Sequence, residues 1–255
     1  MNKDNAFSSE ELKKRLKKGL ELKHFSSIDS TNSEARRLIK NGAPLPLLVT
    51  AEEQTSGRGR QGKSFYSPKD TGIYMSLALG FCESADRLLY LTSAAAVAVC
   101  TAIEKLTEKK PEIKWVNDIY VENKKVCGIL CEAVSLKGST AVIIGIGVNI
   151  STSVFPDDAP QAGCLGCRVN RAVLVSEITD NLLALSESGA DSFIDYYRRH
   201  SMLIGRDIVF TLNNKKTAAT VTGIDDSFAL CVVTESGEIK RLTGGEITVR
   251  TADSQ

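Results

Sequence analysis

The chain has 255 residues, of which 42% are hydrophobic, so it is long enough for one large core or for a core with a small satellite domain. Thirty-two basic residues against thirty-one acidic ones leave a net charge of +1, which disfavours the basic surface typical of nucleic-acid binders. The N-terminal segment is charged throughout and lacks the apolar core of a signal peptide.

The N-terminal part predicts two helices followed by a strand. The charged first segment favours a surface helix. In "STNSEARRLIKNG", Thr31 and Glu34 have the spacing of a capping box and Gly42 provides a stop, so the sequence predicts a helix that begins at or just after Ser30. The apolar, β-branched run "LLVTAE" at residues 47–52 predicts a strand.

The loop "TSGRGRQGKSFYSP", residues 55–68, carries Gly57, Gly59 and Gly62 at the G-x-G-x-x-G spacing, together with two arginines. That spacing marks a dinucleotide site only where a strand leads into a helix. Here the loop leads into "IYMSLALGF", whose apolar residues alternate with a period of two and predict another strand. A kinase glycine loop also joins strands, but the chain has no H-R-D or D-F-G sequence. In isolation, the loop also fits a solvated basic turn.

The following regions predict a helix, a meander, two more helices and a small all-β region. The long helix runs from about Asp86 to Lys110, and no apolar run approaches membrane-spanning length. Turns interrupt the β-rich runs "EIKWVNDIYVENKKVCGILCEAV" and "TAVIIGIGVNI", which indicates an antiparallel meander. Helices are expected near residues 171–188 and 191–203, and five short strand patterns follow Gly205.

Strands and helices do not alternate regularly, which disfavours a parallel doubly wound sheet. The sequence instead predicts an α+β domain at residues 1–204 and a small five-stranded β-barrel at residues 205–255, with the boundary near Ile204. Residues 151–166 contain two prolines and little periodicity, so we expect a mobile loop there, which could become ordered over a bound ligand.

Seven cysteines in a chain without a secretion signal favour a reducing, cytoplasmic location. Cys164 and Cys167 form a C-x-x-C, but no second pair and no nearby histidine complete a zinc site. A metal or redox role is therefore disfavoured for this pair, and most of the cysteines are expected to act as small apolar residues.

Six short motifs occur in the order and at roughly the spacing seen in biotin protein ligases. They are "STN" at 30–32, "GRGRQG" at 57–62, "KWVNDIY" at 114–120, "KVCGIL" at 125–130, "GIGVNI" at 145–150 and "GGEI" at 244–247. The chain resembles this family from about Lys23 onward. The resemblance implies a mixed or antiparallel catalytic domain related to class II aminoacyl-tRNA synthetases, a C-terminal SH3-like β-barrel, and biotinylation through biotinyl-5′-AMP.

The resemblance also implies a biotin site of hydroxyl, amide, guanidinium and backbone groups. The implied biotin-binding residues are Ser30, Thr31, Asn32, Gln54, Gly57, Arg58, Gly59, Arg60, Lys125 and Gly128. The first three residues also suit a helix cap, and both interpretations can hold together. By position alone, Lys125 suits a solvated hairpin residue.

For ATP and the adenylate, the implied contacts are Arg60, Gln61, Gly62, Phe65, Asn117, Asn149, Glu246 and Arg250. The implied catalytic residues are Arg58, Lys114, Asp118 and Lys125, of which Asp118 is the candidate Mg²⁺ ligand. Phe65 replaces a common tryptophan and keeps a smaller aromatic wall for adenine. Val116 replaces the usual proline before Asn117, which puts the turn geometry in question. By position alone, Asn149 also suits a turn residue at the end of a strand. Glu246 and Arg250 also suit an exposed salt bridge.

Charge alone explains why such a site needs cations. The carboxylate of biotin attacks the α-phosphorus of ATP, so an anion must approach a polyanion. Positioned cations and a magnesium ion neutralise the reacting oxygens, and no covalent enzyme nucleophile is needed. Arg58 and Arg60 offer planar forks that match carboxylate and phosphate oxygens, and the loop glycines let backbone N–H groups approach closely.

Two alternatives stay open at this stage. A lipoate ligase shares the chemistry, although the paired arginines and the GGEI motif favour biotin, and a noncatalytic ligand- or RNA-binding module is the alternative of another class. The resemblance implies biotin, ATP and Mg²⁺ as ligands and a biotin carboxyl carrier domain of a carboxylase as partner. We expect no specific DNA binding, no membrane association, and a monomer or homodimer. Only about twenty residues precede the matching region, which favours the monofunctional type without a helix-turn-helix domain.

Overall fold

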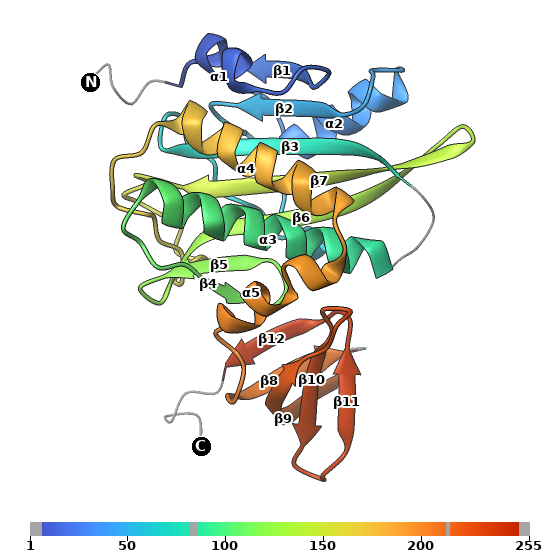
Figure 1. The fold of residues 1–255 in the computed structure, drawn as a ribbon. Coiled ribbons are helices and arrows are strands. Elements are labelled where there is room, and N and C mark those ends of the chain that lie inside the picture. The colour runs from blue at the N-terminus through green and yellow to red at the C-terminus, as the bar shows by residue number, and fades with distance from the viewer. Residues whose placement is uncertain (1–6, 82–85, 213–214, 250–255) are drawn as a thin grey trace.

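The computed structural model describes residues 7–81, 86–212 and 215–249, which form a larger α+β part and a smaller all-β part (Figure 1). A seven-stranded sheet of order β1-β2-β3-β7-β6-β5-β4 lies at the centre of the larger part. Its strands are β1 (Glu21–Phe25), β2 (Leu47–Ala51), β3 (Gly72–Phe81), β4 (Glu112–Lys114), β5 (Asp118–Val121), β6 (Lys124–Leu136) and β7 (Ser139–Asn149). Among these seven described strands, only β1 and β2 pair in parallel, and β4 to β7 form the predicted antiparallel meander.

Helices pack on both faces of this sheet. They are α1 (Ser9–Arg15), α2 (Thr31–Lys40), α3 (Asp86–Leu106), α4 (Arg171–Glu187), η3 (Ala190–Ser192) and α5 (Ile194–Arg199), and the short η2 (Arg60–Gly62) lies in the glycine loop. The side chains of β2 alternate, so Leu48 belongs to the core under α3 while Leu47 and Val49 pack with Ala35 and Ile39 of α2. The sheet is therefore buried by α3 and α4 on one face and by α2 on part of the other.

The structure corrects several details of the predicted elements. The edge strand β1 was not predicted, because its charged residues hide the pattern of a strand. The long helix ends at Leu106 rather than near Lys110, and α5 ends at Arg199 rather than near residue 203. The peptide between Trp115 and Val116 is cis, in the turn that joins β4 to β5.

The helix at residue 31 has a different cap from the predicted one. Ser30 is the N-cap residue, and its hydroxyl accepts the N–H of Ser33 at 3.5 Å. The predicted capping box of Thr31 and Glu34 is therefore wrong. The hydroxyl of Thr31 instead donates to Gln54, which leaves only one of the three polar residues at this end in the role of a cap.

One helix of the described residues, Arg87–Leu106 within α3, is long and apolar enough to cross a membrane, with a mean hydropathy of 1.4. The expectation that no apolar run approaches this length is therefore wrong. Most of this helix is buried, and it packs against α4 and the sheet. A buried core helix of a globular protein can be as long and as apolar as a membrane-spanning helix, so length and composition alone do not distinguish the two.

The smaller part is a five-stranded antiparallel sheet of order β11-β10-β9-β8-β12 (Figure 1). Its strands are β8 (Asp207–Leu212), β9 (Lys215–Ile224), β10 (Leu230–Thr234), β11 (Ile239–Leu242) and β12 (Glu246–Val249). The five predicted strands are confirmed, and so is the α+β class. Ile204 lies in the connection between α5 and β8.

Phe228 joins the smaller part to the larger one. This residue has a positive φ of 64° and a side chain only 1% exposed. Its ring stacks on Phe193 and meets Tyr90 and Tyr197 edge-on. Its carbonyl oxygen accepts the indole N–H of Trp115 at 2.8 Å. An aromatic side chain from the turn between β9 and β10 is thus buried against side chains of the large part.

We expect Phe228→Ala to lower the free energy of unfolding by about 3 kcal/mol or more, because it leaves a cavity among three aromatic rings. Ile239→Ala is the control in the same part of the chain, since Ile239 is 79% exposed, and we expect a change within about 0.5 kcal/mol. Urea denaturation followed by tryptophan fluorescence measures both values. Equal losses in the two variants would contradict the anchoring role of Phe228.

Candidate functional site

A cleft of about 840 Å³ opens on the sheet face that α2 covers only in part. Strands β6 and β7 form its floor, and residues 58–66 of the glycine loop form one wall. Residues between 155 and 162, together with β12 of the small sheet, form the other walls. The N-terminal end of α2 lines the cleft as well, so segments distant in sequence enclose one space.

Three glycines keep the floor of the cleft free of side chains. Gly128 pairs with Gly147 across β6 and β7, and Gly145 lies two residues earlier on the same face. A Cβ at Gly145 would lie 2.0 Å from Oδ1 of Asn32, and a Cβ at Gly147 would lie 2.4 Å from the ring of Phe65. Any larger residue at these positions would displace those two side chains.

The three glycines of the loop have separate structural roles. A Cβ at Gly57 would lie 2.2 Å from the carbonyl oxygen of Phe65, so the two arms of the loop approach closely only because Gly57 has no side chain. Gly62 has a φ of +76°, which favours glycine. The N–H of Gly59 donates to Lys63 within the loop at 2.7 Å. Contrary to expectation, this N–H group is thus used inside the loop.

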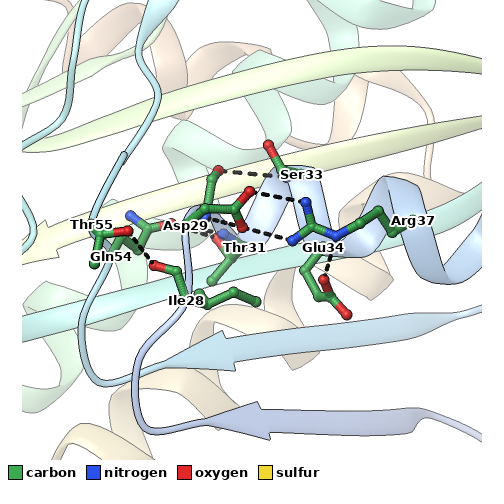
Figure 2. Close-up of polar contacts among 9 residues, drawn as sticks. Ile28, Asp29, Thr31, Ser33, Glu34, Arg37, Gln54 and Thr55 are labelled. Carbon is green, nitrogen blue, oxygen red and sulfur yellow. Dashed lines mark hydrogen bonds and ion pairs between the residues drawn. The ribbon is translucent and has the colours of Figure 1, made fainter.

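The N-terminal end of α2 presents hydroxyl and amide groups to the cleft. Ser30, Thr31 and Asn32 are each at most 4% exposed, and all three line the cleft. The backbone N–H and the hydroxyl of Thr31 donate to Oε1 of Gln54 at 2.8 and 3.1 Å (Figure 2). The amide of Gln54 donates in turn to Ser67 at 2.8 Å. The four residues predicted here are therefore brought together.

The turn before α2 is fixed by an ion pair on the outer side of the helix. Arg37 donates to both carboxylate oxygens of Asp29 at 2.6 and 2.9 Å and to Glu34 at 2.6 Å (Figure 2). The guanidinium of Arg37 holds the pKa of Asp29 below its usual value. Asp29 also accepts the N–H of Ser30 at 2.7 Å. The entry into α2 is thus constrained independently of the cleft.

The two arginines of the loop line the cleft and have different partners. Arg58 forms a bidentate ion pair with Glu132, with N···O distances of 2.9 and 3.0 Å. Arg60 donates to Oδ1 of Asn117 at 2.8 Å and to the carbonyl oxygen of Gly245 at 3.5 Å. Arg58 is therefore held by strand β6, whereas Arg60 lies where the loop meets the small sheet.

Two lysines and a carboxylate form a compact group at the cleft. Nζ of Lys125 lies 2.7 Å from Oδ1 of Asp118. Burial lowers the pKa of Lys114, while the charge of Asp118 raises it and the charge of Lys125 lowers it again. Asn117 is oriented by donating to the carbonyl oxygen of Ile129 at 3.0 Å. The two lysines and Asp118 leave a net positive charge beside the glycine floor.

Asn149 and Phe65 occupy the end of the floor away from α2. Asn149 is 4% exposed, and its Nδ2 donates to the carbonyl oxygen of Gly163 at 3.0 Å. Within the described residues, its Oδ1 is buried and has no hydrogen-bond partner. The ring of Phe65 lies over Gly128 and Gly147. Asn149 therefore keeps an unused acceptor on a residue that lines the cleft, and such an acceptor suits the N–H group of a ligand.

The segment at residues 151–166 contains no helix and no strand, as predicted, but its middle is bonded to β6. The N–H of Lys125 donates to Gln161 at 2.8 Å, and the N–H of Gly163 donates back to Lys125 at 2.9 Å. These two hydrogen bonds place one wall of the cleft beside Lys125. The mobility expected for this segment stays a prediction.

The small sheet contributes Glu246 to the cleft. Its carboxylate accepts from Nζ of Lys63 at 2.5 Å, and this contact holds the pKa of Glu246 below its usual value. Gln61 also lines the cleft, with a φ of 54°. The predicted Arg250 lies outside the described residues.

Three charged residues with partners at the site, Lys63, Glu132 and Arg36, were not predicted. Lys63 follows the glycine motif and forms the contact to Glu246 described above. Glu132 accepts from Arg58, from Arg36 at 3.1 Å and from Asn32 at 2.9 Å. The sequence does contain a signal for Glu132, because it is a lone charge inside the apolar run "CGILCEAV".

Comparison with known proteins gives matches along most of the chain. Residues 24–149 match the Biotin/lipoate A/B protein ligase family, and residues 203–250 match the Biotin protein ligase C terminal domain. The Bifunctional ligase/repressor BirA of Bacillus spizizenii is 32% identical over 244 residues, which cover 90% of this chain and 74% of that protein. The Biotin--[acetyl-CoA-carboxylase] ligase of Paracoccus denitrificans is 32% identical over 221 residues, which cover 79% of this chain and 90% of that protein.

A solved structure agrees with these matches. The biotin protein ligase from Aquifex aeolicus in complex with biotin and ATP superimposes with a TM-score of 0.74 at 28% identity. The superposition covers 91% of this chain and 99% of that one.

The charge group around Lys114 leads to a prediction. We expect Asp118→Asn to lower the pKa of Lys114 further, because burial already lowers it and the variant removes the carboxylate that opposes this effect. NMR titration of the lysine side-chain ¹³Cε signals, with Lys114 assigned through Lys114→Arg, measures the shift. Lys109 serves as the internal control, since its pKa is raised by Glu122 and not by Asp118. An unchanged or higher pKa for Lys114 would contradict this account.

Proposed function

The chain belongs to the biotin protein ligase family, and from this premise we infer that it activates biotin with ATP as biotinyl-5′-AMP and transfers the biotinyl group to a protein lysine. One observation carries the inference. A floor of glycines without side chains joins a buried hydroxyl and amide end at α2 to a middle section lined by Arg58, Arg60, Lys114 and Lys125. That arrangement suits a ligand with a neutral polar head and an anionic tail.

The chemistry of adenylate formation follows from these charges. The carboxylate of biotin attacks the α-phosphorus of ATP, a new O–P bond forms, and pyrophosphate leaves with the electrons of the broken bond. Lys114 and Lys125 place positive charge beside the floor, and the guanidinium forks of Arg58 and Arg60 match carboxylate and phosphate oxygens. In the second step the lysine amine of the acceptor attacks the carbonyl carbon, and AMP leaves.

The hydroxyl and amide end suits the ureido group of biotin. The polar atoms of Thr31 and Gln54 already bond to one another, so their positions are fixed before a ligand enters. A lipoyl group offers a disulfide in place of the ureido N–H and carbonyl groups, so it leaves this end without matching partners. The match of residues 203–250 to a biotin ligase C-terminal domain further favours biotin over lipoate.

Asn149 and Phe65 are proposed to hold adenine. The free Oδ1 of Asn149 suits the exocyclic amine of the base, and the ring of Phe65 offers an apolar face for stacking. Glu246 and Arg250 are proposed to approach the nucleotide from the small sheet. For Glu246 the contact with Lys63, on the same loop as Arg60, supports this placement.

Magnesium is proposed as an ion that arrives with ATP. Within the described residues there is no group of three His, Cys, Asp or Glu side chains that could hold a metal ion. Mg²⁺ commonly keeps several waters and binds one or two carboxylates together with phosphates, so a single carboxylate is compatible with it. Asp118, which lies among the lysines, is the candidate ligand. When bound, the ion would supply positive charge to the phosphate oxygens.

The acceptor is proposed to be the biotin carboxyl carrier domain of a carboxylase, which the names of the relatives support. A cytoplasmic location is proposed on the free cysteines at 100, 127, 131, 164, 167 and 231 of the described chain. Monomer and homodimer remain the proposed states of assembly.

An exchange assay tests the proposed function. We expect incorporation of labelled pyrophosphate into ATP in the presence of biotin, and background incorporation with lipoate or with no acid, because only biotin fits the polar end of the cleft. Exchange driven by lipoate would reassign the substrate. Absence of exchange with every acid, from folded protein with Mg²⁺ present, would favour a noncatalytic binding module.

Arg58→Gly separates synthesis of the adenylate from its retention. We expect the variant to make adenylate but to release it faster, because Lys114, Lys125 and Mg²⁺ still serve the first step while the fork on the loop is lost. Adenylate off-rate and labelling of an unrelated lysine-rich protein measure the effect. Arg15→Ala is the matched control, since Arg15 forms its exposed ion pair with Glu11 in α1, outside the cleft. Loss of synthesis, or unchanged retention, would refute this division of roles.

A further inference from the structure

Glu132 connects the two ends of the candidate biotin site. Its carboxylate accepts two hydrogen bonds from Arg58, one from Arg36 at 3.1 Å and one from Nδ2 of Asn32 at 2.9 Å. The side chain is 16% exposed, so its charge is largely removed from water. A carboxylate in this position is tolerated because all of its partners are donors and two of them are cations.

The local charge is suited to an anionic ligand. Arg36, Arg58 and Glu132 together carry one net positive charge, whereas two unpaired guanidinium groups would repel each other. Glu132 therefore lets two arginines lie close together without cancelling the attraction for an anion.

The geometry of the Arg58 contact leaves donors available. Nη1 and Nη2 of Arg58 each bond to a different oxygen of Glu132, which is an end-on arrangement. A guanidinium has five N–H donors, so the edge formed by Nε and the adjacent Nη keeps N–H groups for a second anion. The Arg58 side chain is 43% exposed and lines the cleft, so such an anion has access to it.

The contact with Asn32 extends the network to the end of the cleft at α2. Asn32 also donates to the carbonyl oxygen of Leu130 at 3.2 Å and accepts from Ser76 at 2.6 Å. Its amide is therefore fixed in orientation by three partners, of which Glu132 is the charged one. A shift of Glu132 would be felt both at the amide end and at the guanidinium of the loop.

We propose that Glu132 is a positioning residue of the ligase, which holds the guanidinium of Arg58 by its end so that the free edge binds and retains the adenylate. This inference rests on the proposed function, because it assigns a role within adenylate retention. Glu132 itself touches neither the reacting carboxylate nor the phosphate in this account. It acts through Arg58.

A double-mutant cycle on the full chain tests the proposal, with the off-rate of preformed biotinyl-AMP as the readout. We expect Glu132→Gln to speed release roughly tenfold, because an amide offers one acceptor oxygen and places an N–H₂ group against a donor. In the Arg58→Gly background we expect Glu132→Gln to add less than about twofold, because Arg58 is already absent and the amide of Asn32 keeps its contacts with Leu130 and Ser76. Glu34→Gln is the matched control, since Glu34 pairs with Arg37 outside the cleft.

Each result decides the matter. Equal effects of Glu132→Gln in both backgrounds, no effect, or slower release would overturn the proposal. If Glu132→Gln does not fold, Arg58→Lys gives the second measurement, because lysine keeps the charge but loses the end-on pair. Release as slow as in the wild type would then overturn the proposal, and faster release would support it. Failure of the wild-type protein to form any adenylate would refute the proposed function instead, so the two failures are distinguishable.

Discussion

Antiparallel pairing of β6 with β7 is the interaction on which the cleft depends. The register sets Gly128 opposite Gly147 and Leu130 opposite Gly145, so the small residues gather on one face while Ile129 and Ile146 face the core under α3. Because side chains alternate along a strand, a slip of one residue would turn the isoleucines into the cleft and the glycines into the core. Glu132 follows Leu130 by two residues on β6, so it lies on the same face of the sheet. There its carboxylate accepts hydrogen bonds from Arg58 of the loop.

Electrostatics of the site differ from those of the whole chain. A net charge of +1 over 255 residues conceals a cleft in which Arg58, Arg60, Lys114 and Lys125 lie near one another. Two of these cations have carboxylate partners in the protein: Arg58 has Glu132 and Lys125 has Asp118. Such ion pairs lower the electrostatic repulsion among the cations. Each cation also retains N–H donors for a ligand, because a guanidinium or ammonium group has more N–H bonds than one carboxylate uses. A bound anion therefore adds to existing contacts, and the cations need not be assembled when it arrives.

Local patterns predicted most of the fold, and they failed where tertiary contacts decide. Alternating apolar residues located the central strands and the small sheet, whereas β1 was missed because its charged residues lie at a sheet edge. Each of the three polar residues at the start of α2 suits a helix cap. In the structure Thr31 bonds to Gln54, and Ser30 is the residue that caps the helix. The partners of Arg58 could not be predicted from the loop, because Glu132 lies 74 residues away in sequence and reaches it only through the fold. Most of the residues in the motifs nevertheless line one cleft, because the pairing of β5, β6 and β7 brings their strands side by side.

Contacts with the small sheet explain why the glycine loop has a defined position at all. The loop is rich in glycine and charge and has no core of its own, so by itself it would populate many conformations. Its arginine and lysine side chains are tied at both ends, Arg58 to β6 and Lys63 to Glu246 of β12, while Arg60 donates to Gly245. The small sheet is in turn held by Phe228 among aromatic side chains of the large part. The burial of one phenylalanine that does not itself line the cleft thus limits where the loop lies, and a loop limited in this way loses less conformational entropy when an anion binds.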